Sequence, residues 1–291
     1  MAAAALLALW LLLPGLGTGQ TADPVGATAL HSKRELLAAA LRRGLAGEPL
    51  VLSSRESPGV LEGDVYAEVP QPLERLAERL GTAGQMCVML YLHLNVHACQ
   101  PGTDAQGQTL EVVVGPKRVD AAGLRHELRY AMRVQSDPPA YFAATLHADK
   151  GPMSTKDYRL VLEAVPIGPG HSFIHVGYGY RFGVLARLTL QAYLATAGRG
   201  KTGFSVEGQD SQGRPLLVEG PRAALERNIM RYYLALLAHA GAPPAGGPQA
   251  MEVRLRTWFA LTERHAGQLH EYDLDEYLRN KRTEPGTALP R

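Results

Sequence analysis

The central part of the chain consists of short segments in which apolar and polar residues alternate. A period of two residues indicates β-strands that bury one face. The strands predicted in this way are LEVVVG (110–115), HELRYAMRV (126–134), YFAATLHAD (141–149), DYRLVLEAV (157–165) and SFIHVGYGYRF (172–182). Turn-forming residues separate them, as at Asp137-Pro138-Pro139 and Gly168-Pro169-Gly170. Consecutive strands joined by such turns predict an antiparallel meander.

Further elements are predicted on both sides of the meander. The segment 65–69 alternates as a strand, and the prolines that follow it precede a helix, LERLAERL (73–80). The stretch YLHLNVHAC (91–99) alternates without a slip and is predicted to be another strand. The remaining predicted elements are helices over 28–47, 185–197, 222–240 and 251–282 and a hairpin over 203–220.

The charge balance bears on the kind of partner. The chain has 291 residues, with 30 basic and 28 acidic side chains and a formal net charge of +2. A nucleic-acid-binding surface needs a strong positive field, so this balance argues against nucleic acid as a partner. The apolar fraction of 46% is that of a globular protein with a core.

The N-terminus resembles a secretory signal peptide. Residues 1–20, MAAAALLALWLLLPGLGTGQ, contain an apolar stretch from Ala2 to Leu13 that is short for a transmembrane helix. No lysine or arginine precedes Lys33, so the usual positive start is missing, and retention of the segment as an anchor is the alternative to cleavage. We therefore expect a periplasmic or secreted protein. In an oxidising compartment, Cys87 and Cys99 are expected to form a disulfide.

The order of the predicted elements resembles that of a known superfamily. A strand, two short helices, six strands and a long helix follow one another, beginning with GDVYAEVPQPLERLAERL (63–80). This order resembles the START-like (helix-grip, SRPBCC) superfamily over roughly residues 60–200. The resemblance implies an α+β fold in which a curved antiparallel sheet wraps around the long helix 185–197, with additional C-terminal helices.

The resemblance also implies a division of the chain. Residues 1–20 are expected to be the signal peptide, 21–59 an N-terminal helix and linker, 60–206 the START-like domain, and 207–291 a hairpin and C-terminal helical extension. The signal-like start and the extension depart from the compact pattern of the superfamily. They suggest an exported bacterial variant whose function does not follow from any one member.

Members of the superfamily hold hydrophobic molecules between the sheet and the helix, so the inward faces of the strands form the candidate site. The residues expected to line this cavity are Tyr130, Met132, Leu146, Tyr158, Leu160, Val176, Tyr178 and Tyr180. A buried tyrosine hydroxyl needs a hydrogen-bond partner, which a ligand head group or a bound water could provide. The alternative is that the tyrosines lie at the cavity mouth with their hydroxyls in solvent.

The predicted strand 91–99 places His93, Asn95 and His97 on one face. Two residues four positions apart on a strand are about 13 Å apart, so His93 and His97 are not expected to share a metal ion. The sequence also contains no HExxH or CxxC motif, and no metal site is expected. We expect these polar residues on the outer face of the sheet beneath the C-terminal helices. A specific polar site under those helices is the alternative.

The sequence predicts neither a cofactor nor a defined catalytic centre. GRGKT (198–202) follows a helix, whereas a phosphate-binding P-loop follows a strand and opens a helix. Asp149, Asp157 and Glu163 are expected to be exposed acids at strand ends. No serine–histidine–aspartate order can be assigned from these residues.

These observations lead us to expect binding or transport of a hydrophobic, lipid-like molecule in an internal cavity. Two readings from other classes stay open. One is a non-catalytic interaction protein with a cavity filled by its own side chains, which binds a cell-envelope protein or a membrane surface. The other is an enzyme that uses the cavity, with His93 or Asp157 as the base.

Overall fold

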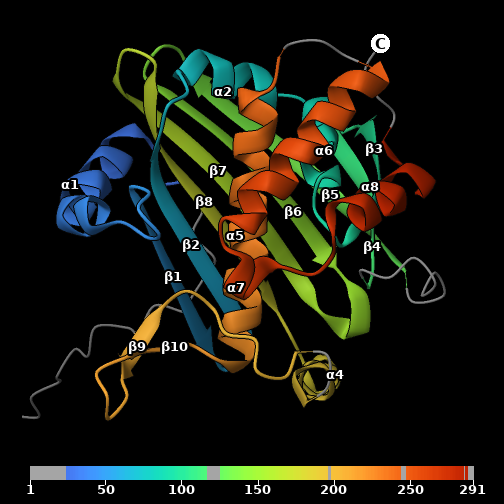
Figure 1. The fold of residues 1–291 in the computed structure, drawn as a ribbon. Helices are drawn as coiled ribbons and strands as arrows, with labels where there is room; N and C mark the ends of the chain where they lie inside the picture. Colours follow the sequence, from blue (N-terminus) through green and yellow to red (C-terminus); the bar gives the residue numbers. More distant parts are fainter. Residues whose placement is uncertain (1–23, 117–124, 196–197, 244–246, 285, 288–291) are drawn as a thin grey trace, which may run out of the picture.

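A computed structural model describes residues 24–116, 125–195, 198–243, 247–284 and 286–287 (Figure 1). The expected signal peptide 1–20 and the end of the helix expected over 185–197 lie outside the described residues. No helix in the described ranges is long and apolar enough to cross a membrane. The fold is α+β, with one large curved sheet and several helices.

The main sheet has nine strands, and all neighbours are antiparallel except the last pair. In spatial order the strands are β1 (Leu50–Ser57), β2 (Val60–Val69), β8 (His171–Arg181), β7 (Lys156–Gly168), β6 (Tyr141–Lys150), β5 (His126–Asp137), β4 (Gly107–Val114), β3 (Val96–Asp104) and β11 (Gly286–Thr287). Strands β3 to β8 are neighbours both in sequence and in space, so they form the antiparallel meander that the alternation predicts.

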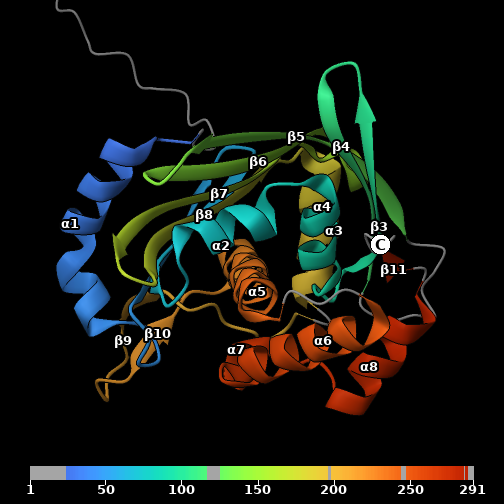
Figure 2. The same cartoon turned by 90° about the horizontal axis from the view of Figure 1, so that it is seen from above.

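The strand register lines up apolar residues on one face. Tyr178 of β8 pairs with Leu160 of β7, Leu160 with Leu146 of β6, and Leu146 with Met132 of β5. Because side chains on a strand alternate between the two faces, this row turns toward the same side of the sheet. The row faces the concave side, where helices cover the sheet (Figure 2).

The long helix on the concave face is α5 (Gly220–Gly241), not the helix expected over 185–197. Ile229, Met230 and Leu236 of α5 belong to one core cluster with side chains of the sheet. The helix expected over 185–197 forms as α4 (Val184–Ala195), which contacts η2 (Pro152–Ser154) and α5. α4 leaves Val184 and Leu188 exposed, whereas α5 is buried on nearly all sides, as a helix enclosed between two layers must be.

The remaining helices enclose α5 and the sheet. α2 (Leu73–Leu80) and α3 (Ala83–Tyr91) lie beside α5, and α6 (Gly247–Glu263), α7 (Ala266–Leu269) and α8 (Leu274–Thr283) form a further layer (Figures 1 and 2). Trp258 of α6 and Tyr277 of α8 share the core cluster of the sheet. The core is therefore continuous across the boundary expected at residue 206.

Two smaller elements complete the fold. α1 (Ala27–Arg43) packs on the convex face, where Leu30 and Leu41 contact a second cluster that includes Phe173. The expected hairpin forms from β9 (Val206–Gln209) and β10 (Pro215–Leu217).

The stretch YLHLNVHAC differs from the expected strand. α3 continues to Tyr91, and the strand begins only at Val96. Between them, the backbone N–H of His93 donates to the carbonyl of Leu90, and that of Val96 donates to the carbonyl of His93, which makes a turn. The alternation over this stretch thus spans the end of a helix, a turn and the start of a strand.

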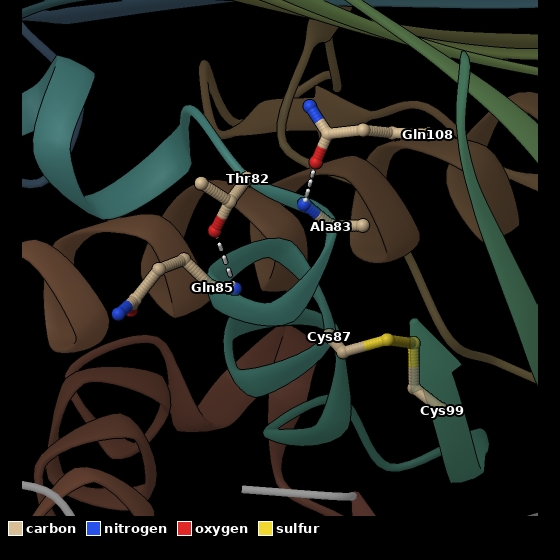
Figure 3. The surroundings of a disulfide bond; sticks show 6 residues. All are labelled: Thr82, Ala83, Gln85, Cys87, Cys99 and Gln108. Atoms are coloured by element: carbon tan, nitrogen blue, oxygen red, sulfur yellow. Dashed lines mark hydrogen bonds between the residues drawn. A yellow bond between two sulfur atoms is a disulfide. The ribbon is translucent and has the colours of Figure 1, made fainter. Parts of the chain in front are cut away.

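A disulfide joins Cys87 of α3 to Cys99 of β3 (Figure 3). The N-terminus of α3 is held by two side chains: Thr82 Oγ1 accepts from the N–H of Gln85 at 3.3 Å, and Gln108 Oε1 accepts from the N–H of Ala83 at 2.6 Å. These bonds satisfy backbone donors that a helix leaves free at its start. They fix α3 against β3 and β4.

Candidate ligand-binding site

Aromatic rings gather between the concave face of the sheet and α5. The ring of Tyr158 on β7 stacks on Tyr180 of β8 at a centroid distance of 5.1 Å. Tyr178 lies 6.4 Å from Tyr158 and 5.4 Å from Tyr232 of α5. Tyr232 stacks in turn on His93 at 4.6 Å. The predicted tyrosines of β7 and β8 therefore meet one another beneath α5.

The apolar residues of the expected cavity lie on the same face. Met132, Leu146, Leu160 and Val176 are buried and belong to the core cluster that includes Tyr130 and Tyr158. All the residues expected to line the cavity are thus brought together on the concave face. The pattern did not assign Tyr232 to this site, although its place in the apolar stripe of the helix 222–240 was visible in the sequence.

Tyrosine hydroxyls are the polar groups of this surface. Tyr158 donates to Thr155 Oγ1 at 2.8 Å. Tyr130, Tyr178 and Tyr180 belong to the same group of side chains on the concave face. Tyr178 and Tyr180 are only partly buried, although they lie in the core region. Burial, and next the neighbouring tyrosines, raise the pKa of Tyr130 and Tyr178 well above the ordinary value, so these hydroxyls stay protonated and can donate.

One end of this surface is closed by α4. Ala186 packs with Leu61 of β2, Phe182 and Leu225 of α5, and Tyr178 and Tyr180 contact the same group. A side chain of α4, Arg187, lies over the ring of Phe182 at 5.8 Å. The tyrosines therefore lie between the sheet, α4 and α5.

The polar residues of YLHLNVHAC do not form the expected outer face. His93 is fully buried and reaches the concave side, where it stacks on Tyr232. Asn95 donates from Nδ2 to the carbonyl of Gly115 at 2.7 Å. His97 is also buried, with Nδ1 2.8 Å from Glu284 Oε1 and Nε2 3.0 Å from the carbonyl of Pro116. For His93 the expected outward orientation is wrong, because the turn at 92–95 breaks the alternation.

These residues hold the C-terminal segment. Lys281 at the end of α8 donates to the carbonyls of His93 at 3.0 Å and Val96 at 2.6 Å, and to Glu284 Oε2 at 3.0 Å. Tyr277 donates to the carbonyl of Leu92 at 2.8 Å. The polar arrangement under the C-terminal helices is therefore an attachment of α8 to the α3–β3 turn.

Glu163 differs from the exposed strand-end acid that the sequence suggests. It is buried on the convex face, where its Oε1 accepts from the Tyr141 hydroxyl at 2.5 Å and from the N–H of Val25 at 2.8 Å. Its Oε2 lies 2.9 Å from Nδ1 of His175, and Nε2 of His175 lies 2.8 Å from Asp64 Oδ1. This cluster ties the start of α1 to the sheet.

One group of potential metal ligands lies on the surface. His147, Asp149 and Asp157 each bring one ligand atom within 4.8 Å of the others. His147 and Asp149 alternate with the inward-facing Leu146 and Ala148, so they face away from the tyrosines. Asp149 is exposed, and Asp157 lies 3.7 Å from Arg181. Such exposed acids are common without an ion.

Comparison with known proteins finds a low similarity to solved structures. No protein-family description matches the chain, and no curated protein matches it. Among solved structures, human StAR-related lipid transfer protein 5 is similar at 11% identity and a TM-score of 0.35, covering 58% of this chain and 91% of its own. Human STARD10 is similar at 11% identity and a TM-score of 0.36, covering 63% and 79%.

A third solved structure covers more of the chain. A conserved protein of unknown function from Enterococcus faecalis is 7% identical, with a TM-score of 0.35, and covers 78% of this chain and 98% of its own. Identities and TM-scores this low carry no conclusion about the function of this chain. The chain itself has a strand, two helices and a six-strand meander in the order that the resemblance to the START-like superfamily implies, but α4 and the hairpin β9–β10 separate the meander from the long helix α5 on the concave face.

Proposed function

We propose that the chain binds a hydrophobic, lipid-like small molecule on the concave face of the sheet, between β7, β8, α4 and α5. The observation that carries this proposal is the set of hydroxyls of Tyr130, Tyr178 and Tyr180. They lie among apolar side chains on the concave face. Polar groups in such surroundings are normally satisfied. A ligand head group that accepts hydrogen bonds would satisfy them.

The affinity would come chiefly from burial of apolar surface. Each square ångström removed from water contributes about 25 cal/mol before the entropic costs of binding. The aliphatic row Met132, Leu146 and Leu160 would contact the apolar part of the ligand. The tyrosines at its end would orient the polar part.

We test the position of the site with a matched pair of substitutions on β5. Met132→Trp adds a large side chain to the concave face, while Arg133→Trp adds the same side chain to the exposed outer face one residue further on. Titration with a fluorescent fatty-acid analogue should show binding to the wild type and to Arg133→Trp. We expect Met132→Trp to weaken binding at least tenfold while thermal unfolding stays cooperative. Equal binding by both variants would show that the ligand does not bind on the concave face.

The same titration distinguishes ligand binding from the alternative, in which the core is filled by the protein's own side chains. If the wild type neither binds the analogue nor takes up molecules from a lipid extract, its core is filled by its own side chains. The chain would then act through its surface, on a cell-envelope protein or a membrane. The dense packing of α5 against the sheet is the observation on which that alternative depends.

We also propose that the protein is exported. The support is the apolar segment 1–20 and the disulfide between Cys87 and Cys99, which fits an oxidising compartment. Fractionation of a bacterial host and N-terminal sequencing of the recovered protein would test this. Recovery of the protein with an intact N-terminus in the reducing cytosol would contradict export.

A further inference from the structure

A groove runs along α1, which lies on the convex side of the sheet, away from α5 and the tyrosines (Figure 2). Its volume is about 300 Å³, and it is open to solvent. α1 lines it from Arg34 to Arg42, a stretch that spans about 12 Å of helix at 1.5 Å per residue. Pro49 and Glu68 also line it. The groove is therefore elongated in the direction of α1.

Backbone contacts fix the part of the groove that faces α1. The N–H of Glu68 donates to the carbonyl of Pro49 at 3.0 Å. In the segment that joins α1 to β1, the N–H groups of Leu45 and Glu48 each donate to the other residue's carbonyl at 3.0 Å. Gly44, with a φ of 66°, ends α1 so close to this segment that a Cβ atom would lie 2.4 Å from the carbonyl oxygen of Glu48. The groove therefore has a defined shape in the folded chain.

The groove combines apolar side chains with charged ones. Ala38 is half-buried and Leu41 is buried, and both line the groove between its charged residues. At one end, Arg34 Nε donates to Glu68 Oε1 at 2.7 Å, so these two charges balance each other. The charges that remain along the groove belong to Glu35 and Arg42, which are both exposed.

Glu35 and Arg42 carry opposite charges at a separation that the helix sets. They are seven positions apart, so they lie on nearly the same side of α1 and about 10.5 Å apart along its axis. Arg42 and Arg43 are in the last turn, where the helix dipole places about half a negative charge. Two guanidinium groups exceed that charge. The end of the groove at Arg42 therefore attracts an anion, and the part at Glu35 attracts a cation.

We infer that this groove binds a short peptide with free ends, with its amino group beside Glu35 and its carboxylate beside Arg42. Three residues of extended chain measure about 10 Å, which matches the separation of the two charges. Ala38 and Leu41 contact the apolar side chains of the peptide. Because exposed ion pairs each contribute little, the affinity is weak and depends on both charged ends. This site goes beyond the proposed ligand on the concave face and does not depend on it.

Titration of the full chain with trialanine, followed by ¹⁵N NMR spectra, tests this inference. We expect saturable shifts of the backbone amides of residues 34–42 and of Glu68. N-acetyl-trialanine amide has the same methyl groups but no charged end, and it should cause no such shifts. Arg42→Gln should weaken binding about fivefold, as the loss of one exposed ion pair would. The matched control Arg43→Gln, at an exposed position that does not line the groove, should bind like the wild type.

Both substitutions replace exposed side chains, so both variants should keep the melting temperature of the wild type. The absence of saturable shifts with trialanine, equal binding of the capped peptide, or equal affinity of the two variants would overturn the inference. Displacement of trialanine by the fluorescent fatty-acid analogue would also overturn it, because the peptide would then occupy the concave face. Binding of trialanine that the analogue leaves unchanged would support a separate site on α1, whether or not the analogue itself binds.

Discussion

At the scale of single residues, the cluster of Glu163, His175 and Asp64 shows how strands far apart in sequence build one polar site. Burial alone would raise the pKa of Glu163, but hydrogen bonds from His175 and Tyr141 outweigh it and lower that pKa. Burial alone would lower the pKa of His175, but Asp64 and Glu163 outweigh it and raise that pKa. The charged forms of both groups are therefore stabilised by folding.

These opposite shifts predict a stability maximum in weak acid. The contribution of His175 is complete below its unfolded pKa of 6.5 and is lost as pH rises through its higher folded pKa. The contribution of Glu163 is complete above its unfolded pKa of 4.5 and is lost as pH falls through its lower folded pKa. We expect the contribution of this cluster to the free energy of unfolding to be greatest between pH 4.5 and pH 6.5.

Urea unfolding between pH 3 and 9 measures this dependence. Glu163→Gln should flatten the profile at both ends, because it removes one titrating group and one partner of His175. The exposed His171→Gln serves as the control and should leave the profile unchanged. Parallel profiles for the wild type and Glu163→Gln would show that the cluster does not link folding to pH.

Lys281 carries a second prediction at this scale. It is buried, and it donates to the carbonyls of His93 and Val96 and to Glu284. Lys281→Met would remove these three hydrogen bonds and leave the buried carboxylate of Glu284 without its lysine partner, so we expect a loss of about 3 kcal/mol in the free energy of unfolding. The neighbouring Arg282→Met removes only an exposed pair with Glu252 and should cost about 1 kcal/mol or less. Equal losses in urea unfolding would refute the attachment of α8 to the α3–β3 turn.

At the scale of elements, the alternation of apolar and polar residues was sufficient to predict the strands of the meander. A strand that buries one face shows a period of two in its own sequence. The alternation was not sufficient for YLHLNVHAC, where a helix end and a turn happen to continue a period of two. The local sequence pattern also could not predict that α5, and not α4, covers the concave face of the sheet. The polar side of α5 suggests solvent exposure, yet Glu226 is buried and accepts from the N–H of Phe204 at 2.6 Å.

The candidate site was predictable to a similar extent. Alternation placed the tyrosines of β5, β7 and β8 on one face, and the register then brought them together. The stacking of His93 on Tyr232 and the hydrogen bond from His239 to the carbonyl of Arg79 join residues more than 100 positions apart. A single sequence carries no local signal for such pairs.

At the scale of the whole molecule, one core extends from β1 to α8. Residues of β2, α3, α5 and α6 belong to the same cluster, so α5 contributes to the core of the sheet. A chain ending at residue 206 would expose the apolar concave face to water. We expect such a truncated protein to aggregate or to lack cooperative urea unfolding, whereas the full chain unfolds in one transition. Cooperative unfolding of the truncated chain would establish the boundary at 206 instead.

The most direct measurement is native mass spectrometry of the protein recovered from the periplasm of a bacterial host. The binding account predicts a mass excess that corresponds to a bound hydrophobic molecule. Solvent extraction should remove that excess, and Met132→Trp should lack it while Arg133→Trp retains it. A mass equal to that of the polypeptide alone, with no gain after incubation with a lipid extract, would contradict the account.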